Sequence, residues 1–462
     1  MKKLMLSIIL GCGSLSVSAQ PMNHPLGSAM TNGSLSIPHV GSSHVYNPAT
    51  GASMLYTDGG GFGIGLVLGS VGLGLEVGPI EDIAASLDST LDEFFSIQET
   101  VTAQVNSGQI PSLSIIQDIE DKIGGLLEDA GNAFYFDLNA AVQGPTPLVV
   151  SHTSFGSISF DMNIGAKAKL DIVDSPLSLD FSNLDEPIST NTSLYFKTGG
   201  VLETSLTYGR EVFKHTAGTL YGGVTASYYM GVMSKSLIPI LEYDTAFDKL
   251  GDDLEQLVKN VASFDTSQPG ASSTFGLDLG AVWSASFYRA GMTIHNINAP
   301  SLDYPELGQN CDTDTCWVAL SMSDKIDLKE QYTMNPQITI DGLVHTQSRT
   351  WYAGAALDLN AGNDYVGDEY QWFSVAAGYA PRLWSAWFIM PAVRAGFKSN
   401  LVGSQLSYLN FGLSWLFVNF DLAYSLTSFD ASKVPQMEEI ASSIPIGIPR
   451  GLAFNLGLHM MF

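Results

Sequence analysis

Apolar residues occupy every second position over long stretches of this chain. Between Phe275 and Phe287, large apolar side chains alternate with Gly, Asp, Val and Ser. Successive side chains of a β-strand point to opposite faces, so this period of two predicts strands that each have one apolar face. The predicted strands cover residues 61–77, 132–143, 146–172, 193–213, 218–236, 275–287, 332–346, 350–360, 371–380 and 386–398.

The phase of the alternation changes at Arg289 and again after Phe417, with no polar loop between the two apolar sets. We expect a tight hairpin turn at each place, which brings the estimate to about 12–14 strands. The best candidate for a membrane-spanning helix, residues 61–75, is rich in glycine and follows the period of two. A spanning helix needs about 20 mostly apolar residues. We therefore expect no transmembrane helix after the N-terminal segment.

The charged fraction is low for a water-soluble domain, since only 14% of the residues are Asp, Glu, Lys or Arg. The usual share is about 25%. The 46 acidic residues outnumber the 20 basic ones, for a net charge of −26. Binding of nucleic acid depends on Lys and Arg, so no nucleic-acid partner is expected. The 45% hydrophobic content excludes a disordered chain.

The first 19 residues have the pattern of a secretory signal peptide. Lys2 and Lys3 precede an apolar run, and small residues then lead to Ala19, after which we expect cleavage. The alternative is a lipoprotein signal that ends at Cys12. In an exported protein, Cys311 and Cys316 are expected to form a disulfide that closes the loop between them. A redox role would favour C-x-x-C, and a metal site would need further ligands nearby.

Soluble sandwiches and membrane barrels share this alternation, and three features favour a barrel. Short and long connections alternate along the chain. The last strand carries an apolar stripe and ends at Phe462, like the assembly signal of bacterial outer-membrane barrels. Aromatic residues cluster near the strand ends, as in membrane-interface girdles: Tyr228, Tyr229, Phe287, Tyr288, Trp351, Tyr352, Trp372, Phe373, Trp384 and Trp387. The prediction is an all-β, antiparallel outer-membrane β-barrel that contacts lipid and the barrel-assembly machinery of a Gram-negative bacterium.

Two stretches follow a helical period instead. Apolar residues three or four apart predict an acidic helical hairpin at about 79–129 and a helix at about 240–264. Their apolar faces either pack on each other and on the barrel rim, or form a lid or plug over the lumen. Residues 430–449, which contain Ile444, Ile446 and Ile448 among three prolines, are expected to form an irregular outer loop.

Tyr46, Asn47, Pro48 and Ala49 resemble the NPA segment of the FadL family of hydrophobic-compound transporters. The whole chain is similar to a related group of outer-membrane barrels named conjugal-transfer TraF-like. The segments that carry the resemblance, besides NPA and the acidic insertion, are PLVV (147–150), AGMTIHNINAPSL (290–302), YTMNPQITIDG (332–342) and WYAGAALDLNAG (351–362). The resemblance implies a hatch-like segment at 20–60, a barrel over 61–462, and a ligand path beside residues 46–49. The alternative for Asn47 and Pro48 is a simple turn.

No pattern of a catalytic or cofactor site occurs in the chain. H-E-x-x-H, G-x-S-x-G and nucleotide-binding glycine motifs are absent. His24, His39 and His44 lie together in the N-terminal segment, but their spacing fits no usual metal-ligand pattern. No metal, no cofactor and no enzymatic activity are therefore expected.

Three classes of function remain. The first is passive transport or binding of a small hydrophobic compound, which predicts a partly plugged lumen with an apolar pocket. The second is a structural or assembly component of a conjugation or surface-appendage system, which predicts a stable protein partner. The third is an outer-membrane enzyme, which predicts a Ser/His or Asp/His cluster at the outer rim. Transport is the first choice.

Overall fold

The computed structural model describes residues 29–37, 46–55, 62–79, 135–144, 148–176, 178–179, 188–239, 269–308, 314–380, 391–416, 418–429 and 448–461, together with a few isolated positions. Most of both predicted helical insertions, most of the loop 430–449, the histidines 24, 39 and 44, and the tryptophans 384 and 387 lie outside these ranges. Within the described residues, no helix has the length and apolar character needed to cross a bilayer.

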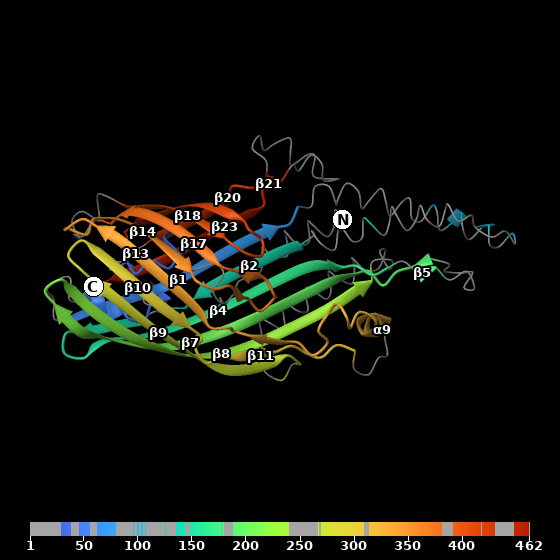
Figure 1. The fold of residues 1–462 in the computed structure, drawn as a ribbon, viewed down its shortest axis with the longest axis horizontal. Helices are drawn as coiled ribbons and strands as arrows, with labels where there is room; N and C mark the ends of the chain where they lie inside the picture. The colour runs from blue at the N-terminus through green and yellow to red at the C-terminus, as the bar shows by residue number, and fades with distance from the viewer. Residues whose placement is uncertain are drawn as a thin grey trace.

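The strands form one closed antiparallel barrel with fourteen positions (Figure 1). In the order in which they pair around the barrel, the strands are β1 (Phe62–Val77), β23 (Gly451–Met461), β20 (Val418–Ser425), β19 (Ser407–Trp415), β18 (Ala392–Asn400), β17 (Trp372–Tyr379), β14 (Trp351–Asp358), β13 (Gln337–His345), β10 (Tyr288–His295), β9 (Ala271–Ser284), β8 (Gly218–Pro239), β7 (Ser193–His215) and β4 (Gly156–Val173). The all-β antiparallel barrel predicted from the alternation is confirmed.

The fourteenth position is shared by two short strands, β2 (Tyr135–Gln143) and β3 (Leu148–His152). Both pair with β1 on one side and with β4 on the other. The prediction of a single strand over 146–172 was wrong, because residues 153–155 turn the chain back between β3 and β4. The predicted hairpins near Arg289 and after Phe417 are confirmed by the pairs β9–β10 and β19–β20.

The apolar residues of β1 change phase along the strand, from Ile64 and Leu66 at even positions to Val71 and Leu73 at odd ones. The cause is local. Val67 lies opposite His459 and Gly69 lies opposite Leu458, so Leu68 is an extra residue with no partner on β23. Such a β-bulge shifts every later side chain to the other face. The apolar set therefore moves from even to odd positions after residue 68, and the strand continues without a break.

The outer wall of the barrel is apolar and its inner wall is polar. Exposed apolar side chains alternate with buried polar ones in the lipid-facing part of the wall, for example in β9 and in residues 205–208 of β7, as expected for a barrel in lipid. The outer set includes Ile158, Phe160, Leu206, Phe275, Leu277, Leu279, Val344, Val375, Phe411, Leu413, Phe420, Leu452, Phe454, Leu456 and Leu458. The inner set includes Asp161, Asn163, Lys167, Asp278, Arg289, His295, Asp358, Arg394, Lys398, Asn410, Asp421 and Asn455.

The aromatic pairs were predicted to lie together in the interface girdles, and this is wrong for three pairs. Tyr228 and Trp351 are exposed on the outer wall, but Tyr229 and Tyr352 point into the barrel and are 2% and 8% exposed. Trp372 is also buried. Adjacent residues of a strand face opposite sides, so only one member of such a pair can reach the lipid interface.

The two ends of the barrel differ. At one end, the strands are joined by short turns at 153–155, 216–217, 285–287 and 346–350. Longer connections at the other end carry β5 (Ser178–Leu179), β6 (Ile188–Ser189), β11 (Ser301–Asp303), α9 (Asp314–Ser321), β12 (Gln331–Thr333), β15 (Gly362–Asn363), β16 (Glu369–Tyr370), β21 (Ser428–Phe429) and β22 (Ile448–Pro449). Barrels of this type place long loops outside the cell and short turns in the periplasm. We call the long-loop end the mouth.

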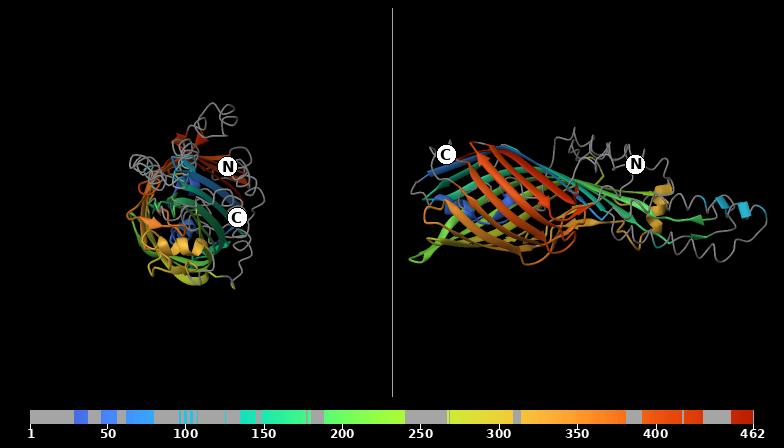
Figure 2. Two further views of the ribbon diagram at one scale, coloured as in Figure 1. Left: turned by 90° about the vertical axis from the view of Figure 1, so that its right-hand side faces the viewer. Right: turned by 90° about the horizontal axis from the view of Figure 1, so that it is seen from above.

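The strands are also unequal in length. β7 and β8 have 23 and 22 residues, whereas β10, β14, β17 and β20 have eight each. About 9–11 residues of a strand suffice to cross a bilayer. β4 has 18 residues, and its end at Val173 pairs with the start of β7 at Ser193. β4, β7 and β8 therefore continue together past the short strands at the mouth, where α9 lies against β8 (Figures 1 and 2).

Candidate functional site

Two described N-terminal stretches, residues 29–37 and 46–55, lie inside the barrel, and together we call them the lumenal segment (Figure 2). They contain the short helices α2 (Ala29–Asn32) and α4 (Thr50–Leu55). Charged wall residues bind this segment. The Arg289 guanidinium donates to the Ser53 hydroxyl at 3.0 Å and to the Ser36 carbonyl at 3.3 Å. The Asp341 carboxylate accepts from the backbone N–H and the hydroxyl of Ser36 at 3.0 and 2.9 Å.

A second set of polar contacts holds α2. The hydroxyl of Thr31 donates to Asp421, which is paired with Arg394 through an Nε–Oδ1 distance of 2.8 Å. The Tyr352 hydroxyl donates to the Asn32 side chain at 2.8 Å. All of these groups are buried. Buried polar groups are stable only when they are hydrogen-bonded, so these contacts fix the position of the segment.

The turn at Asn47 and Pro48 lies against a row of glycines. Gly209, Gly223 and Gly280 are neighbours on β7, β8 and β9. A Cβ atom on any of them would lie less than 3.0 Å from Asn47 or Pro48. The Asn47 amide donates to the carbonyls of two wall residues at 3.2 and 3.3 Å, and its Oδ1 accepts from the backbone N–H two residues later. The glycine row is therefore the seat of this turn.

Of the four residues predicted to line a ligand path, only Tyr46 borders a described cavity. Asn47 and Ala49 are buried against the wall, at 1% and 0% exposure, and Pro48 lies over the glycine row. A role of this segment beside a ligand stays a prediction. Cys316 is disulfide-bonded, but Cys311 lies outside the described residues, so the identity of the pair also stays a prediction.

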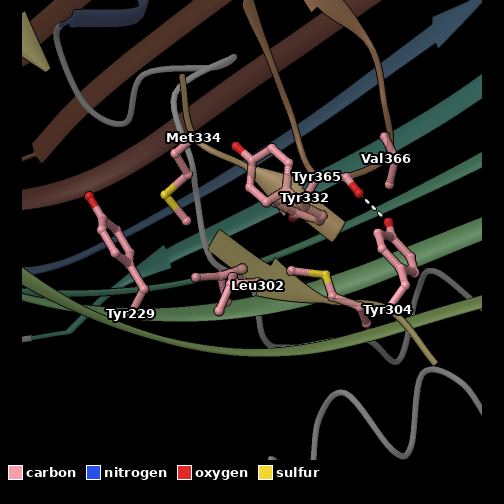
Figure 3. Close-up of a cluster of buried hydrophobic side chains, with 9 residues drawn as sticks. Tyr229, Leu302, Tyr304, Tyr332, Met334, Tyr365 and Val366 are labelled. Atoms are coloured by element: carbon pink, nitrogen blue, oxygen red, sulfur yellow. Dashed lines mark hydrogen bonds between the residues drawn. The ribbon is translucent and has the colours of Figure 1, made fainter. Parts of the chain in front are cut away.

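The mouth half of the lumen is filled by a different kind of cluster, which we call the loop cap (Figure 3). Side chains from the β11–β12 and β15–β16 connections pack on the inner faces of β7 and β8. The Tyr304 hydroxyl donates to the Tyr365 carbonyl, and the Tyr332 hydroxyl donates to the Asn363 carbonyl at 3.1 Å. The buried members of the loop cap are Val201, Tyr229, Met233, Leu302, Tyr304, Tyr332, Met334, Tyr365 and Val366.

Beside the loop cap lies a cavity of about 740 Å³, which we call the mouth pocket. Its charged and aromatic lining residues are Glu76, Tyr135, Asp137, Lys167, Lys169, Asp171, Tyr195, Lys197, Lys325, Asp327, Glu330, Asp368, Glu369, Tyr370 and Trp372. Its size is in the range of pockets that take small molecules. Seven carboxylates and four lysines are included, so the pocket is acidic as well as aromatic.

The lysines of the mouth pocket are held in ion pairs. Lys167 contacts Asp137 and Asp368 at 2.5 Å each, and it also bonds to Asp364. Lys169 contacts Asp368 at 3.0 Å. Burial alone would raise the pKa of the Asp368 carboxyl, but the two ammonium groups outweigh burial and hold this pKa well below its usual range. The pocket therefore keeps a fixed pattern of both charges.

A smaller cavity of about 80 Å³, the middle chamber, lies between the lumenal segment and the loop cap. Its lining residues are Gly33, Ser34, Tyr46, Asn163, Glu203, Tyr229, Asp278, His295, Gln337, Thr339, Ala356, Asp358, Tyr370, Trp372, Ser374 and Lys398. Tyr370 and Trp372 line both cavities, so their rings stand at the boundary. The Lys398 ammonium lies 3.7 Å from the centroid of the Trp372 ring.

The middle chamber contains an Asp–His pair, in which His295 Nδ1 lies 3.1 Å from Asp278. An enzyme was expected to place such a pair at the outer rim, whereas this one is deep in the lumen. Among the described residues, no hydroxyl is bonded to the His295 ring, so the pair has no nucleophile beside it. Neither of these two cavities is the purely apolar pocket that a hydrophobic-compound transporter predicts, because charged side chains stand among the aromatic ones in both linings.

Of the residues that line the middle chamber, the sequence predicted only Tyr46 as part of a ligand path, and it did not predict the charged ones. Glu203, Asp278 and Asp358 are inward-facing residues of three strands that are far apart in the sequence. The only signal in the sequence was a charged residue within an otherwise apolar alternation, as at Asp278.

Among solved structures, the chain is similar to two toluene transporters. TbuX of Ralstonia pickettii has 12% identity and a TM-score of 0.36, over 94% of this chain and 96% of that chain. TodX of Pseudomonas putida has 10% identity and a TM-score of 0.38, over 96% and 99%. A FadL homologue of Pseudomonas aeruginosa has 12% identity and a TM-score of 0.37, over 97% and 99%. Likenesses this distant leave the substrate of this chain open.

No curated protein has a sequence that matches the chain. A family model described as "F plasmid transfer operon, TraF, protein" matches residues 44–358, which is more than half of the sequence. The matched region begins in the lumenal segment and ends on β14, so it includes the glycine row, the loop-cap residues up to Met334 and most of the walls of the middle chamber. The chain therefore belongs to this TraF family.

Proposed function

We propose that the protein is a passive outer-membrane transporter for a small compound with both apolar and polar groups. The observation that supports this best is the stacking of two cavities along the lumen, with Tyr370 and Trp372 in the walls of both. A compound would enter the mouth pocket, pass these rings and reach the middle chamber. The resemblance of residues 46–49 to the FadL family agrees with this role.

The walls argue for an amphipathic compound over a pure hydrocarbon. Tyr135, Tyr195, Tyr370 and Trp372 offer ring surface in the mouth pocket, and carboxylates and lysines lie between them. A hydrocarbon in this pocket would cover charged groups without replacing their hydrogen bonds, which is unfavourable. A ligand with a polar head group avoids that loss, and its apolar part can still pack on the rings.

Passage beyond the middle chamber requires the lumenal segment to move. In this proposal the segment is the hatch, and residues 46–49 turn away from the glycine row when it opens. The protein acts in the outer membrane after export by the signal at residues 1–19, with its last strand read by the barrel-assembly machinery. The proposal includes no enzymatic step and no cofactor.

Selective blocking of the mouth pocket tests the proposal. Lys325→Cys, at the wall of the pocket, would be labelled with a bulky maleimide; Lys329→Cys, four residues away and outside the pocket lining, is the matched control. The readout is uptake of radiolabelled 2-phenylethanol, phenethylamine and 3-phenylpropanoate by cells with and without the barrel. Labelling at 325 should reduce barrel-dependent uptake at least severalfold, and labelling at 329 should not. If the barrel increases uptake of none of the three compounds, the proposal is wrong.

A second candidate is an assembly role, which one surface feature favours. On α9, at the end of the long strands, Trp317 and Leu320 are 61% and 37% exposed outside the lipid-facing wall. Exposed aromatic residues are common at protein interfaces. Affinity purification from native membranes with the unaltered chain and with Trp317→Ser tests this role. A partner that is recovered in stoichiometric amount with the first and lost with the second would support it.

A further inference from the structure

We infer that the middle chamber is a binding subsite for an ammonium group, so that the transported compound is an amphipathic organic cation. This inference rests on the proposed function and names its substrate class. It is carried by three properties of the chamber: its carboxylates, an unpaired buried acceptor, and its aromatic walls.

The carboxylates of the chamber exceed its cations. Glu203 accepts hydrogen bonds from the hydroxyls of Ser205 and Ser227 at 2.8 and 3.2 Å, and no described cationic group lies within ion-pair distance of it. Asp358 accepts from the Thr339 hydroxyl at 2.7 Å and from the Trp372 backbone N–H at 2.9 Å. A carboxylate inside the barrel without a paired cation, such as Glu203, is costly, so a cationic ligand would be stabilised beside it.

The side chain of Asn163 is a second, independent indication that the chamber binds a group that donates hydrogen bonds. This side chain lines the chamber and is only 6% exposed, and its Oδ1 atom has no hydrogen-bond partner. An unpaired buried acceptor is less stable than one that is hydrogen-bonded to water. An ammonium group has only donors to offer and would satisfy it. A carboxylate or another acceptor would leave Asn163 Oδ1 unpaired and would also face Glu203.

The aromatic walls match the same ligand. Tyr46, Tyr229, Tyr370 and Trp372 line the chamber together with the carboxylates. Aromatic faces attract ammonium groups, and this attraction strengthens when water is excluded. The Lys398 ammonium already lies over Trp372, so an interaction of this kind occurs within the site itself. A metal ion fits less well, since no cluster of three or more His, Cys, Asp or Glu with metal-binding geometry occurs among the described residues.

The volumes of the middle chamber and the mouth pocket limit the size of each part of the ligand. The middle chamber, at about 80 Å³, has room for an ammonium head group but not for a whole small molecule. The mouth pocket, at about 740 Å³, can hold the rest. A ligand that spans the boundary would place its apolar body beside Tyr370 and Trp372 and its head group near Glu203.

The test compares three compounds of similar shape that differ in charge: phenethylamine, 2-phenylethanol and 3-phenylpropanoate. Binding to the folded barrel in detergent is measured by equilibrium dialysis at pH 7. Phenethylamine should bind about tenfold more tightly than 2-phenylethanol, as expected for a charge-assisted hydrogen bond. Glu203→Gln should remove most of this preference and leave the affinity for 2-phenylethanol unchanged. Glu211→Gln, on the same strand but outside the chamber, is the matched control.

Equal binding of phenethylamine and 2-phenylethanol by the unaltered barrel would overturn the inference, as would an unchanged preference in Glu203→Gln. If Glu203→Gln does not fold, Asn163→Leu replaces it, with the same expected loss of preference. Failure of the inference differs from failure of the proposed function. Cells that take up the neutral compound through the barrel, with no preference for the amine, would retain transport and exclude the ammonium subsite.

Discussion

The barrel is filled from both ends, and the two fillings differ in their chemistry. The lumenal segment is held by hydrogen bonds to charged wall residues: Arg289 donates to it, and Asp341 and Asp421 accept from it. Its turn rests on the backbone of a glycine row. The loop cap is a cluster of tyrosine, methionine and leucine side chains with only a few hydrogen bonds. Both occupy the lumen, but different interactions stabilise them.

This difference indicates which filling moves. Packed aromatic clusters lose both burial and contacts when they open, because water replaces neither. Hydrogen bonds between the lumenal segment and the wall can be exchanged for hydrogen bonds to water, so the net free energy of opening is smaller. The loop cap is therefore expected to be the permanent part of the molecule, and the lumenal segment the part that opens. Four experiments test whether the two fillings differ in this way.

The largest effect is expected from Tyr365→Ala in the loop cap. Tyr365 is 2% exposed, and truncation of a fully buried aromatic ring costs about 3–5 kcal/mol. The free energy of unfolding in urea, measured in lipid vesicles, should fall by this amount. Tyr365→Phe keeps the ring and should cost about 1 kcal/mol at most. Equal losses in the two variants would mean that the ring does not stabilise the loop cap.

A smaller effect is expected when the seat of the lumenal segment is filled. Gly223→Ala places a methyl group against the backbone of Pro48, which cannot rotate away, and overpacking of this kind costs about 1–3 kcal/mol. This free energy reduces the stability of the contact between the lumenal segment and the barrel wall. Ala49→Cys, at a position with 0% exposure, reports that docking through its rate of maleimide labelling. Addition of Gly223→Ala should raise this rate about tenfold or more.

Gly342→Ala is the control for this experiment. It lies on β13, and the nearest atom to an added Cβ would be 3.9 Å away. The extra methyl group should therefore leave the labelling rate of Ala49→Cys unchanged. If both glycine variants have the same effect, the glycine row is not the seat of the segment.

The polar contacts of the segment should each contribute less. Arg289→Met removes the donors to Ser36 and Ser53 but nearly preserves side-chain volume, and it should weaken docking by roughly 1–2 kcal/mol. Labelling of Ala49→Cys would become about tenfold faster. Arg210→Met, at an exposed position on β7, is the control and should have no effect. Slower labelling in Arg289→Met would show that this arginine strains the segment and does not hold it.

The sequence predicted the wall of the barrel better than its contents. The alternation at Phe275–Phe287 depends only on neighbours in the chain, so it predicted a strand and its outward face correctly. The bulge at Leu68 is visible in the sequence as a change in the phase of the alternation, but the sequence does not show that β23 is the strand that pairs there. The prediction that Tyr229 and Tyr352 lie in the girdle was wrong because each is adjacent to an outward-facing residue of the same strand and therefore faces the lumen.

The contents depend on register between distant strands. Gly209, Gly223 and Gly280 form a row only because β7, β8 and β9 pair in one particular register. Glu203 and Asp358 reach one chamber from β7 and β14, which are separated by four strands of the barrel. A single sequence contains neither fact, so a search for local motifs could not find the chamber.

The smallest effect concerns pH and the loop that carries the cap. Asp368 follows Tyr365 and Val366 in the β15–β16 connection, and Lys167 and Lys169 keep the pKa of its carboxyl below the usual range. Its folded-state pKa is therefore lower than its unfolded value of about 4. The ionised Asp368 carboxylate therefore contributes its full share to the free energy of unfolding above pH 4, roughly its unfolded pKa. This contribution is lost as the pH falls below that value. The contribution of Asp368 to the urea concentration at the unfolding midpoint should accordingly change little between pH 7 and 5. It should then decrease toward pH 3.

Asp368→Asn isolates this contribution. The variant should be less stable than the unaltered barrel at pH 7, and the difference between the two should shrink as the pH decreases from 4 to 3, because the unfolded chain then binds a proton at Asp368 that the folded carboxylate does not. Labelling of Ala49→Cys should be the same in both at every pH, since no described contact joins Asp368 to the lumenal segment. A change in that labelling would mean that the loop cap and the lumenal segment are coupled, and that acidification at the mouth is transmitted to the hatch.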